Sequence, residues 1–154
     1  MSGPARAARC LPVALVISAA TVSACASPVV LDDPPVDEAT RQACTSLVAA
    51  LPTTVLGSAR RETTGTLGGA WGDPPITVAC GIAEPPGLTP TAECLEVDGV
   101  GWWQQPGRGG EVYTTIGRAA VVQVGVPSAY GEPTAALVEL APAVGAVPVV
   151  RPCV

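Results

Sequence analysis

Apolar residues recur at the helical interval in two stretches of the chain, residues 37–51 and 133–142. The repeating positions are Cys44, Leu47, Val48 and Leu51 in the first stretch, and Leu137, Leu140 and Ala141 in the second. Pro52 should stop the first helix, because proline cannot continue a helix, and Pro142 should kink or end the second. We therefore expect one helix near each end of the folded part.

Between these stretches, apolar and polar residues alternate, which predicts strands. The sharpest alternation follows the proline-containing turn at residues 71–75, where a strand carries Ile76, Val78 and Cys80 on its inner side. Residues 53–66 are interpreted as a strand that frays into a mobile loop. The tail, residues 147–154, is expected to return as an edge strand.

Two hairpins follow in residues 95–102 and 112–126. Asp98 and Gly99 suit the two-residue turn of the first hairpin, and Gly117 with Arg118 suits that of the second. The predicted fold class is α+β: an antiparallel sheet of about five or six strands, with the N-terminal and the C-terminal helix packed on one face.

The first 24 residues have the order of a secretory signal: two arginines, an apolar run and then small residues. Residues 22–25, Val-Ser-Ala-Cys, match the lipobox of bacterial lipoproteins, in which Cys25 receives acyl chains such as palmitate. Cleavage after Ala26 with ordinary secretion, or a retained anchor helix, are the alternatives. The expected domains are a lipoprotein signal peptide (1–24), a lipidated Cys25 with an acidic, Pro-rich tether (25–38), and a single disulfide-stapled domain (39–154).

Composition and charge narrow the functional classes. The chain lacks Lys, His, Asn and Phe, a bias typical of a GC-rich bacterial genome. Loss of Arg6 and Arg9 with the signal would leave six arginines against thirteen acidic residues, a net charge of −7. A nucleic-acid-binding surface requires the opposite sign, so we expect no nucleic acid as partner.

Four cysteines remain in the predicted domain, an even number that indicates two disulfides in an oxidising compartment. They are Cys44, Cys80, Cys94 and Cys153. Four cysteines allow three pairings, and we favour Cys80 with Cys94 and Cys44 with Cys153. The chain has no His and no Cys-x-x-Cys pair, so we expect no metal site and no cofactor.

Trp103 and three arginines are the candidates for a binding surface. Adjacent residues of a strand point to opposite faces, so either Trp102 or Trp103 is expected to be exposed, where it could stack on a sugar or anchor a partner. Arg60 and Arg61 could hold an anion, and Arg118 lies at a predicted hairpin tip. Core packing of the tryptophans and solvated or ion-paired arginines are the structural alternatives.

This composition offers few routes to catalysis. Without His or Lys, the usual means of activating a serine or cysteine nucleophile are missing. Carboxylate pairs remain, either Glu93 with Glu96 or Asp73 with Glu62, and these could act on a glycan. We expect that the protein is not an enzyme.

Short motifs between residues 40 and 145 occur in one order. They are Cys44-x-x-Leu47, Leu51-Pro52, Ala70-Trp71-Gly72-Asp73-Pro74-Pro75, Cys80-Gly81, Val100-x-Trp102, Thr114-Thr115-x-Gly117-Arg118 and Val126-Pro127. Together they resemble an actinobacterial family of small exported or membrane-anchored proteins described only as a domain of unknown function. The resemblance implies a location in the cell envelope and transfers no catalytic residues.

The expected function is that of a cell-envelope lipoprotein, held by its lipid at the extracytoplasmic face of the cell membrane. We interpret it as a non-catalytic interaction or assembly module that meets an envelope protein. The alternatives are a lipoprotein that binds a cell-wall glycan or a small anion, and an envelope hydrolase that uses carboxylates. An interaction module should expose an apolar patch of several hundred Å², whereas a ligand-binding protein should have a concave pocket with converging polar groups.

Overall fold

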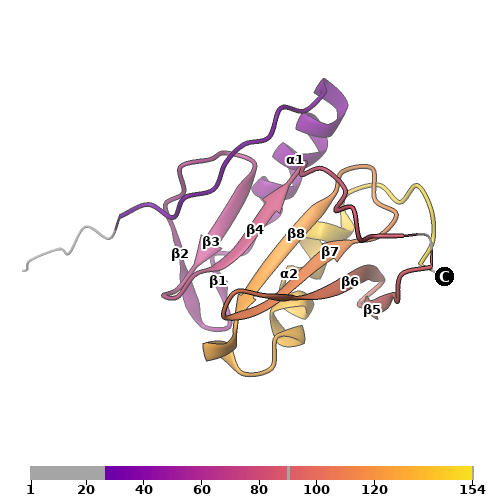
Figure 1. Cartoon of the computed structure of the whole chain (residues 1–154). Helices are drawn as coiled ribbons and strands as arrows, with labels where there is room; N and C mark the ends of the chain where they lie inside the picture. The colour runs from indigo at the N-terminus through magenta and orange to yellow at the C-terminus, as the bar shows by residue number, and fades with distance from the viewer. Residues whose placement is uncertain (1–26, 90, 154) are drawn as a thin grey trace, which may run out of the picture.

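Eight antiparallel strands form one sheet in the computed structural model, which describes residues 27–89 and 91–153 (Figure 1). In sheet order they are β1 (Thr54–Val55), β2 (Ser58–Arg61), β3 (Gly68–Trp71), β4 (Ile76–Cys80), β8 (Val122–Pro127), β7 (Gly110–Thr115), β6 (Val100–Gly107) and β5 (Leu95–Val97). The last four strands of the chain form a meander whose final strand, β8, pairs with β4.

Two helices, α1 (Glu38–Ala50) and α2 (Thr134–Gly145), lie on the same face of the sheet (Figure 1). The Asp37 side chain caps α1 by accepting a hydrogen bond from the amide of Thr40 at 2.9 Å. A short 3₁₀ helix, η1 (Ser128–Tyr130), connects β8 to the segment before α2. The predicted α+β class and both helices are confirmed. We call the face of the sheet that is turned away from the helices the open face.

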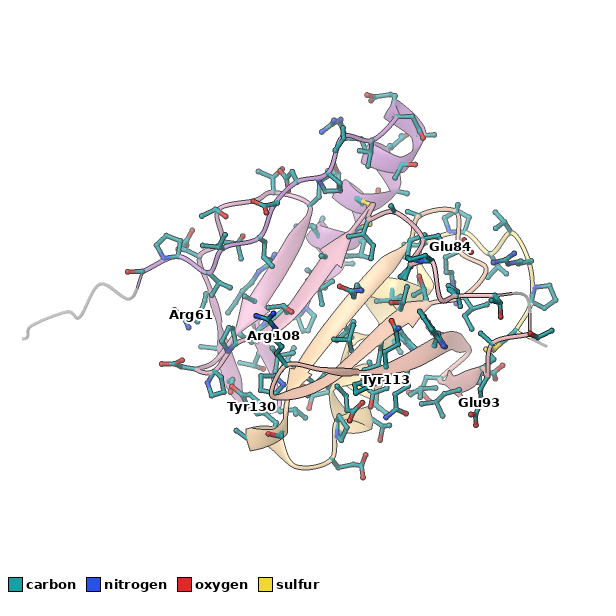
Figure 2. All side chains as sticks on the ribbon, viewed as in Figure 1. Arg61, Glu84, Glu93, Arg108, Tyr113 and Tyr130 are labelled. Atoms are coloured by element: carbon teal, nitrogen blue, oxygen red, sulfur yellow. A yellow bond between two sulfur atoms is a disulfide. The ribbon has the colours of Figure 1, made fainter. Side chains whose placement is uncertain are left out.

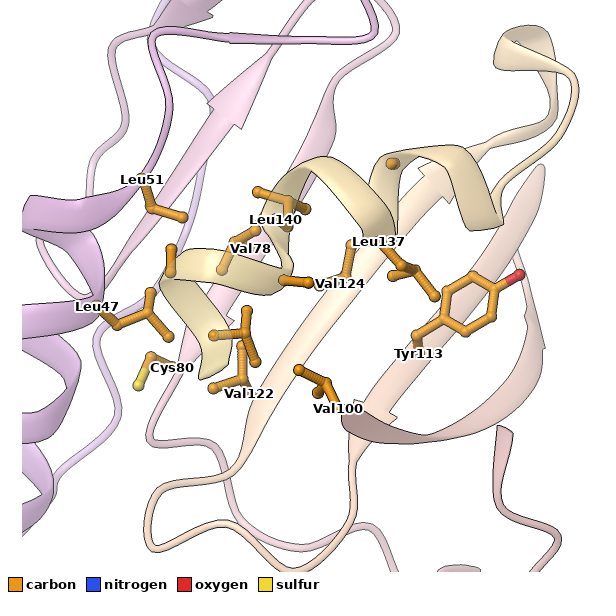
Figure 3. Close-up of a cluster of buried hydrophobic side chains, with 14 of the residues drawn as sticks. Leu47, Leu51, Val78, Cys80, Val100, Tyr113, Val122, Val124, Leu137 and Leu140 are labelled. Atoms are coloured by element: carbon orange, nitrogen blue, oxygen red, sulfur yellow. The ribbon is translucent and has the colours of Figure 1, made fainter. Parts of the chain in front are cut away.

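The core lies between the helices and the sheet (Figure 3). Ile76, Val78 and Cys80 of β4 are fully buried at alternate positions, as their spacing predicts. The largest fully buried side chains are Trp71, Trp102 and Tyr113.

The count of five or six strands was too low, because the structure has eight. β3 has the sequence Gly-Gly-Ala-Trp, so it lacks the alternation of apolar and polar side chains that reveals a strand. β1 and β2 form a tight hairpin whose turn residues, Leu56 and Gly57, both have positive φ. The tail forms no strand in its described part, where a single bridge joins Arg118 and Val149.

The turn at Asp98 and Gly99 is confirmed, with φ of 47° and 74° at its two residues. The β7–β8 pairing is also confirmed, but the two strands are joined by residues 116–121 and not by a two-residue turn. Gly117 there accepts hydrogen bonds from the amides of Val150 and Arg151 at 2.8 and 3.2 Å. Residues 116–121 are thus longer than a two-residue turn, and they bind the C-terminal tail through these hydrogen bonds.

Helix α2 continues past Pro142 to Gly145, although we expected the helix to kink or end at this proline. Pro142 is exposed, and Val138, whose carbonyl would receive the missing amide bond, is 48% exposed. We infer that water takes the place of the lost hydrogen bond on this solvent-facing side.

All four predicted cysteines form disulfides, but the pairing we favoured was wrong. The bonds join Cys44 to Cys80 and Cys94 to Cys153. The inner stripe of α1 places Cys44 directly over the inner side of β4, where Cys80 lies. Gly87 lies against Trp103 on the open face, and Cys94 precedes β5 at the edge of the sheet, far from Cys80 on β4.

The segment expected to be a tether lies against the domain. We call residues 27–36 the strap. Its residue Val29 forms a parallel bridge with Thr63, and Val36 packs on the core. The predicted signal peptide and the predicted lipidation site at Cys25 lie outside the described residues.

Candidate functional site

Trp102 and Trp103 point to opposite faces of β6, as the strand geometry predicts. Trp102 is fully buried and contacts Tyr113 edge-to-face, with 6.5 Å between ring centroids. Trp103 is half-buried on the open face. A Cβ added at Gly87 would lie 2.8 Å from Cη2 of Trp103, so loop 81–93 covers part of the indole ring.

A pocket of about 480 Å³ opens beside Trp103, and we call it the Trp103 pocket. Its lining residues are Glu93, Cys94, Leu95, Trp103, Gln104, Gln105, Pro106 and Glu111. The pocket exists because β5 pairs with β6 only as far as Leu95 opposite Trp102. The remainder of β6 therefore has no neighbouring strand on this edge.

The functional groups around the Trp103 pocket are an indole ring, two primary amides and two carboxylates. The amide of Gln104 donates to Oε2 of Glu111 at 3.3 Å, which orients that carboxylate. Figure 2 labels Glu93 on the edge of the sheet that carries β5 and β6. Amides and carboxylates together offer both donors and acceptors, and none of the described residues that line the pocket is cationic.

Arg60 and Arg61 lie on β2, the second strand in sheet order, whereas β6 is the seventh. Arg60 is placed over the ring of Trp71, 5.8 Å from its centroid. Arg61 donates to the carbonyl of Gly72 at 3.0 Å and to that of Ser27 at 2.9 Å. The two side chains point to opposite faces of the sheet, so they do not form one anion site.

Arg118 holds three segments of backbone together. Its guanidinium donates to the carbonyls of Gly145, Val147 and Gly99 at 3.0, 2.8 and 2.8 Å. Burial of the group lowers the pKa of Arg118. Arg118, which we predicted to lie at a hairpin tip, therefore has a structural role: it connects its own loop to other parts of the backbone. The structure does not bring Trp103 together with any of the three predicted arginines.

Sequence reasoning did not consider Glu111 and Arg108. Glu111 lines the Trp103 pocket, and Arg108 lies at the tip of the β6–β7 hairpin, over a second hollow of about 160 Å³ on the open face (Figure 2). This second hollow forms where Gly125 leaves space next to Thr77. The glycine-rich run at residues 107–110 could have revealed the hairpin, but no local signal could have placed Glu111 and Glu93 on one pocket.

Residues 7–151 match the model of a family described as a protein of unknown function, DUF3515. The chain belongs to this family. Membership confirms the expected resemblance to a family of unknown function, while an actinobacterial origin stays a prediction. No curated protein and no solved structure matches the chain. The family assigns no role to any residue, so the functional argument rests on geometry.

Of the two carboxylate pairs that were candidates for catalysis, Glu93 and Glu96 do not come together. Glu93 lines the Trp103 pocket, whereas Glu96 lines a separate hollow beside Arg118 and Cys153. Asp73 lies in the β3–β4 turn, with a side chain that is 92% exposed. Within residues 27–89 and 91–153, no group of three or more potential ligands could hold a metal ion. In the same residues, neither helix has the length and apolar character needed to cross a bilayer.

Proposed function

We propose that the protein is a non-catalytic lipoprotein of the cell envelope, anchored at the outer face of the cytoplasmic membrane, that binds a glycan in the Trp103 pocket. The observation that carries this proposal is the concave pocket itself, whose lining combines an indole ring, two amides and two carboxylates at the edge of the sheet. Pockets with a few converging polar groups are typical of small-ligand sites.

The chemistry of the lining supports a sugar. The apolar C–H face of a sugar ring can pack on the uncovered part of Trp103, since an aromatic ring offers both area and a favourable electrostatic face. The amides of Gln104 and Gln105 can donate to and accept from hydroxyl groups, and the carboxylates of Glu93 and Glu111 can accept from them. A small anion has less support, because Arg61 and Arg118 are occupied by backbone carbonyls.

An interaction or assembly module has less support from the described surface. Such a module should show a contiguous apolar patch. The exposed large apolar residues are instead distributed over the strap, α2 and the tail. They are Val30, Val138, Val149 and Val150.

Tryptophan fluorescence can test glycan binding with little ambiguity. Trp71 and Trp102 are fully buried, so a change in emission on adding cell-wall glycan fragments reports mainly on Trp103. Replacing Glu111 by Ala removes a charged hydrogen-bond acceptor, and we expect the Kd to rise about 10- to 100-fold. The matched control is Glu62→Ala, which removes an exposed carboxylate beyond the far end of β2 and should leave the Kd unchanged.

Two results would contradict the proposal. One is a folded protein whose emission and retention on immobilised glycan do not change with any cell-wall fragment. The other is an equal Kd for the parent protein and the Glu111→Ala variant.

A further inference from the structure

The strap is bound to the domain along its backbone. The amide of Val29 donates to the carbonyl of Glu62 at 2.8 Å, and the amide of Thr64 donates to the carbonyl of Val29 at 3.0 Å. Further along, the amide of Leu31 donates to Oγ1 of Thr64 at 3.0 Å. These bonds extend the sheet hydrogen-bonding pattern by one short parallel pairing.

Asp33 fastens the middle of the strap to the loop before β3. Its carboxylate accepts from the amides of Thr66 and Leu67, both at 2.8 Å, and from the hydroxyl of Thr66 at 2.7 Å. A carboxylate that accepts several hydrogen bonds makes a stronger attachment than neutral groups would.

Two glycines permit the close approach of the strap. A Cβ at Gly65 would meet the carbonyl oxygen of Leu31 and lie 2.6 Å from Oδ1 of Asp33. A Cβ at Gly68 would first meet the carbonyl oxygen of Val78 in β4, and it would also lie 3.3 Å from Cδ1 of Leu31. These glycines form no phosphate-binding motif. Their role is structural, because a side chain at Gly65 would block the place where the strap packs on the domain.

The attachment continues to Ser27, the first described residue, whose carbonyl accepts from Arg61 at 2.9 Å. The proposed lipid-bearing residue, Cys25, precedes Ser27 by two positions, and two residues span at most about 7 Å. A lipidated cysteine lies at the membrane surface, where its acyl chains enter the bilayer. Ser27 must then lie within about 7 Å of that level.

The Trp103 pocket lies at the other end of the sheet from Ser27. Five strand spacings separate β2 from β6, and at about 4.8 Å each they give roughly 24 Å. Figure 2 shows Arg61 and Glu93 on opposite sides of the molecule, and Figure 1 shows the strap beside β2 and β3.

We propose that the strap orients the domain on the bilayer, with the corner formed by Ser27, Arg61 and Asp73 against the phospholipid head groups and the Trp103 pocket facing away from them. This corner carries one cation and one exposed anion, which suits a polar head-group layer. The proposal rests on the lipid anchor in the proposed function. It explains how a short anchor can present a glycan site toward the cell wall and not toward the membrane.

Short-range quenching by lipid head groups tests the orientation. The full chain, exported and lipidated by its host, is reconstituted in phosphatidylglycerol and phosphatidylethanolamine vesicles that carry spin-labelled head groups. A fluorescent amino acid replaces either Asp73 or Glu93, which avoids adding a cysteine to a disulfide-bonded protein. We expect severalfold stronger quenching at position 73 than at position 93.

Release of the strap provides the second arm of the test. Asp33→Ala removes the bonds to Thr66 and Leu67 and leaves those at Val29 and Ser27, so the difference between positions 73 and 93 should become smaller. The matched control is Asp32→Ala, because Asp32 is an exposed neighbouring carboxylate with no side-chain hydrogen bond among the described residues. Its quenching pattern should equal that of the parent protein.

Equal quenching at positions 73 and 93 in the parent protein would overturn the orientation, and so would an unchanged ratio in the Asp33→Ala variant. The mass of the N-terminal peptide separates this failure from that of the proposed function. A peptide without lipid refutes the anchor and the orientation together, whereas a lipidated peptide with equal quenching refutes the orientation alone. Glycan binding in solution is measured independently of either result.

Discussion

At the scale of single residues, burial and hydrogen bonding decide what each side chain contributes. Tyr113 and Tyr130 illustrate the range, since both are tyrosines near the β7 end of the core. The hydroxyl of Tyr130 donates to the carbonyl of Pro74 at 2.8 Å. The hydroxyl of Tyr113 is buried and has no hydrogen-bond partner among the described residues. Burial, followed by the carboxylates of Glu111 and Glu132, raises the pKa of Tyr113.

Tyr113→Phe is therefore expected to stabilise the protein. An unsatisfied buried polar group costs about 1–3 kcal/mol, so deleting this hydroxyl should raise the free energy of unfolding by about 1 kcal/mol. Tyr130→Phe is the matched control with the opposite sign, because it removes a hydrogen bond worth about 0.5–1.5 kcal/mol. Urea unfolding of both variants measures the difference. A Tyr113→Phe variant that loses as much stability as Tyr130→Phe would contradict the assignment.

At the scale of elements, the strap is an additional edge element whose middle is fastened by one carboxylate, that of Asp33. Desolvation alone would raise the pKa of Asp33, but hydrogen bonds from Thr66 and Leu67, with Arg41 nearby, outweigh it and lower the pKa below the usual 3.8. The stabilising contribution of Asp33 is thus fully present above the unfolded pKa of 3.8 and is lost as the pH falls through the lower folded pKa.

We expect the strap to loosen only in acid, below pH 3.8. The amide chemical shifts of Thr66 and Leu67, followed by NMR as the pH is lowered, should move with the protonation of Asp33. The Asp33→Asn variant should lose this titration, while Asp32→Asn should keep it. An inflection that persists in Asp33→Asn would mean that another group controls the strap.

At the scale of the whole molecule, the two disulfides fasten different parts of the fold. Cys44 and Cys80 are fully buried between α1 and the sheet, whereas Cys94 and Cys153 are partly exposed beside β6. Cys94 also lines the Trp103 pocket, so the second disulfide connects the tail to the proposed ligand site.

Limited reduction of the native protein should open the Cys94–Cys153 bond first, because a thiolate must reach a sulfur atom to attack it. Alkylation and peptide mass mapping identify which cysteines are released. The Kd for the glycan should rise once Cys94 is free, while the far-UV circular dichroism stays native. Release of Cys44 and Cys80 before the other pair would contradict this order.

Local pattern alone was sufficient for both helices, the buried face of β4 and the Asp98-Gly99 turn. Each of these depends on residues that are close in sequence, through the helical or strand period or through the positive φ that a turn requires. The inventory of disulfide cysteines was likewise evident, since an even set of cysteines behind a predicted export signal predicts pairing.

Only the tertiary structure decided the pairing of those cysteines, the place where the strap packs on the domain and the position of the Trp103 pocket. Each arises from contacts between segments far apart in sequence: α1 over β4, Asp33 on the loop before β3, and Glu93 with Glu111 on one pocket beside β6. Arg118 shows the same limit, because its sequence position suggested a free hairpin tip while its partners come from two distant segments, residues 145–147 and Gly99. Residue spacing carries information about local geometry, and it contains no measure of which distant backbone groups a side chain will meet.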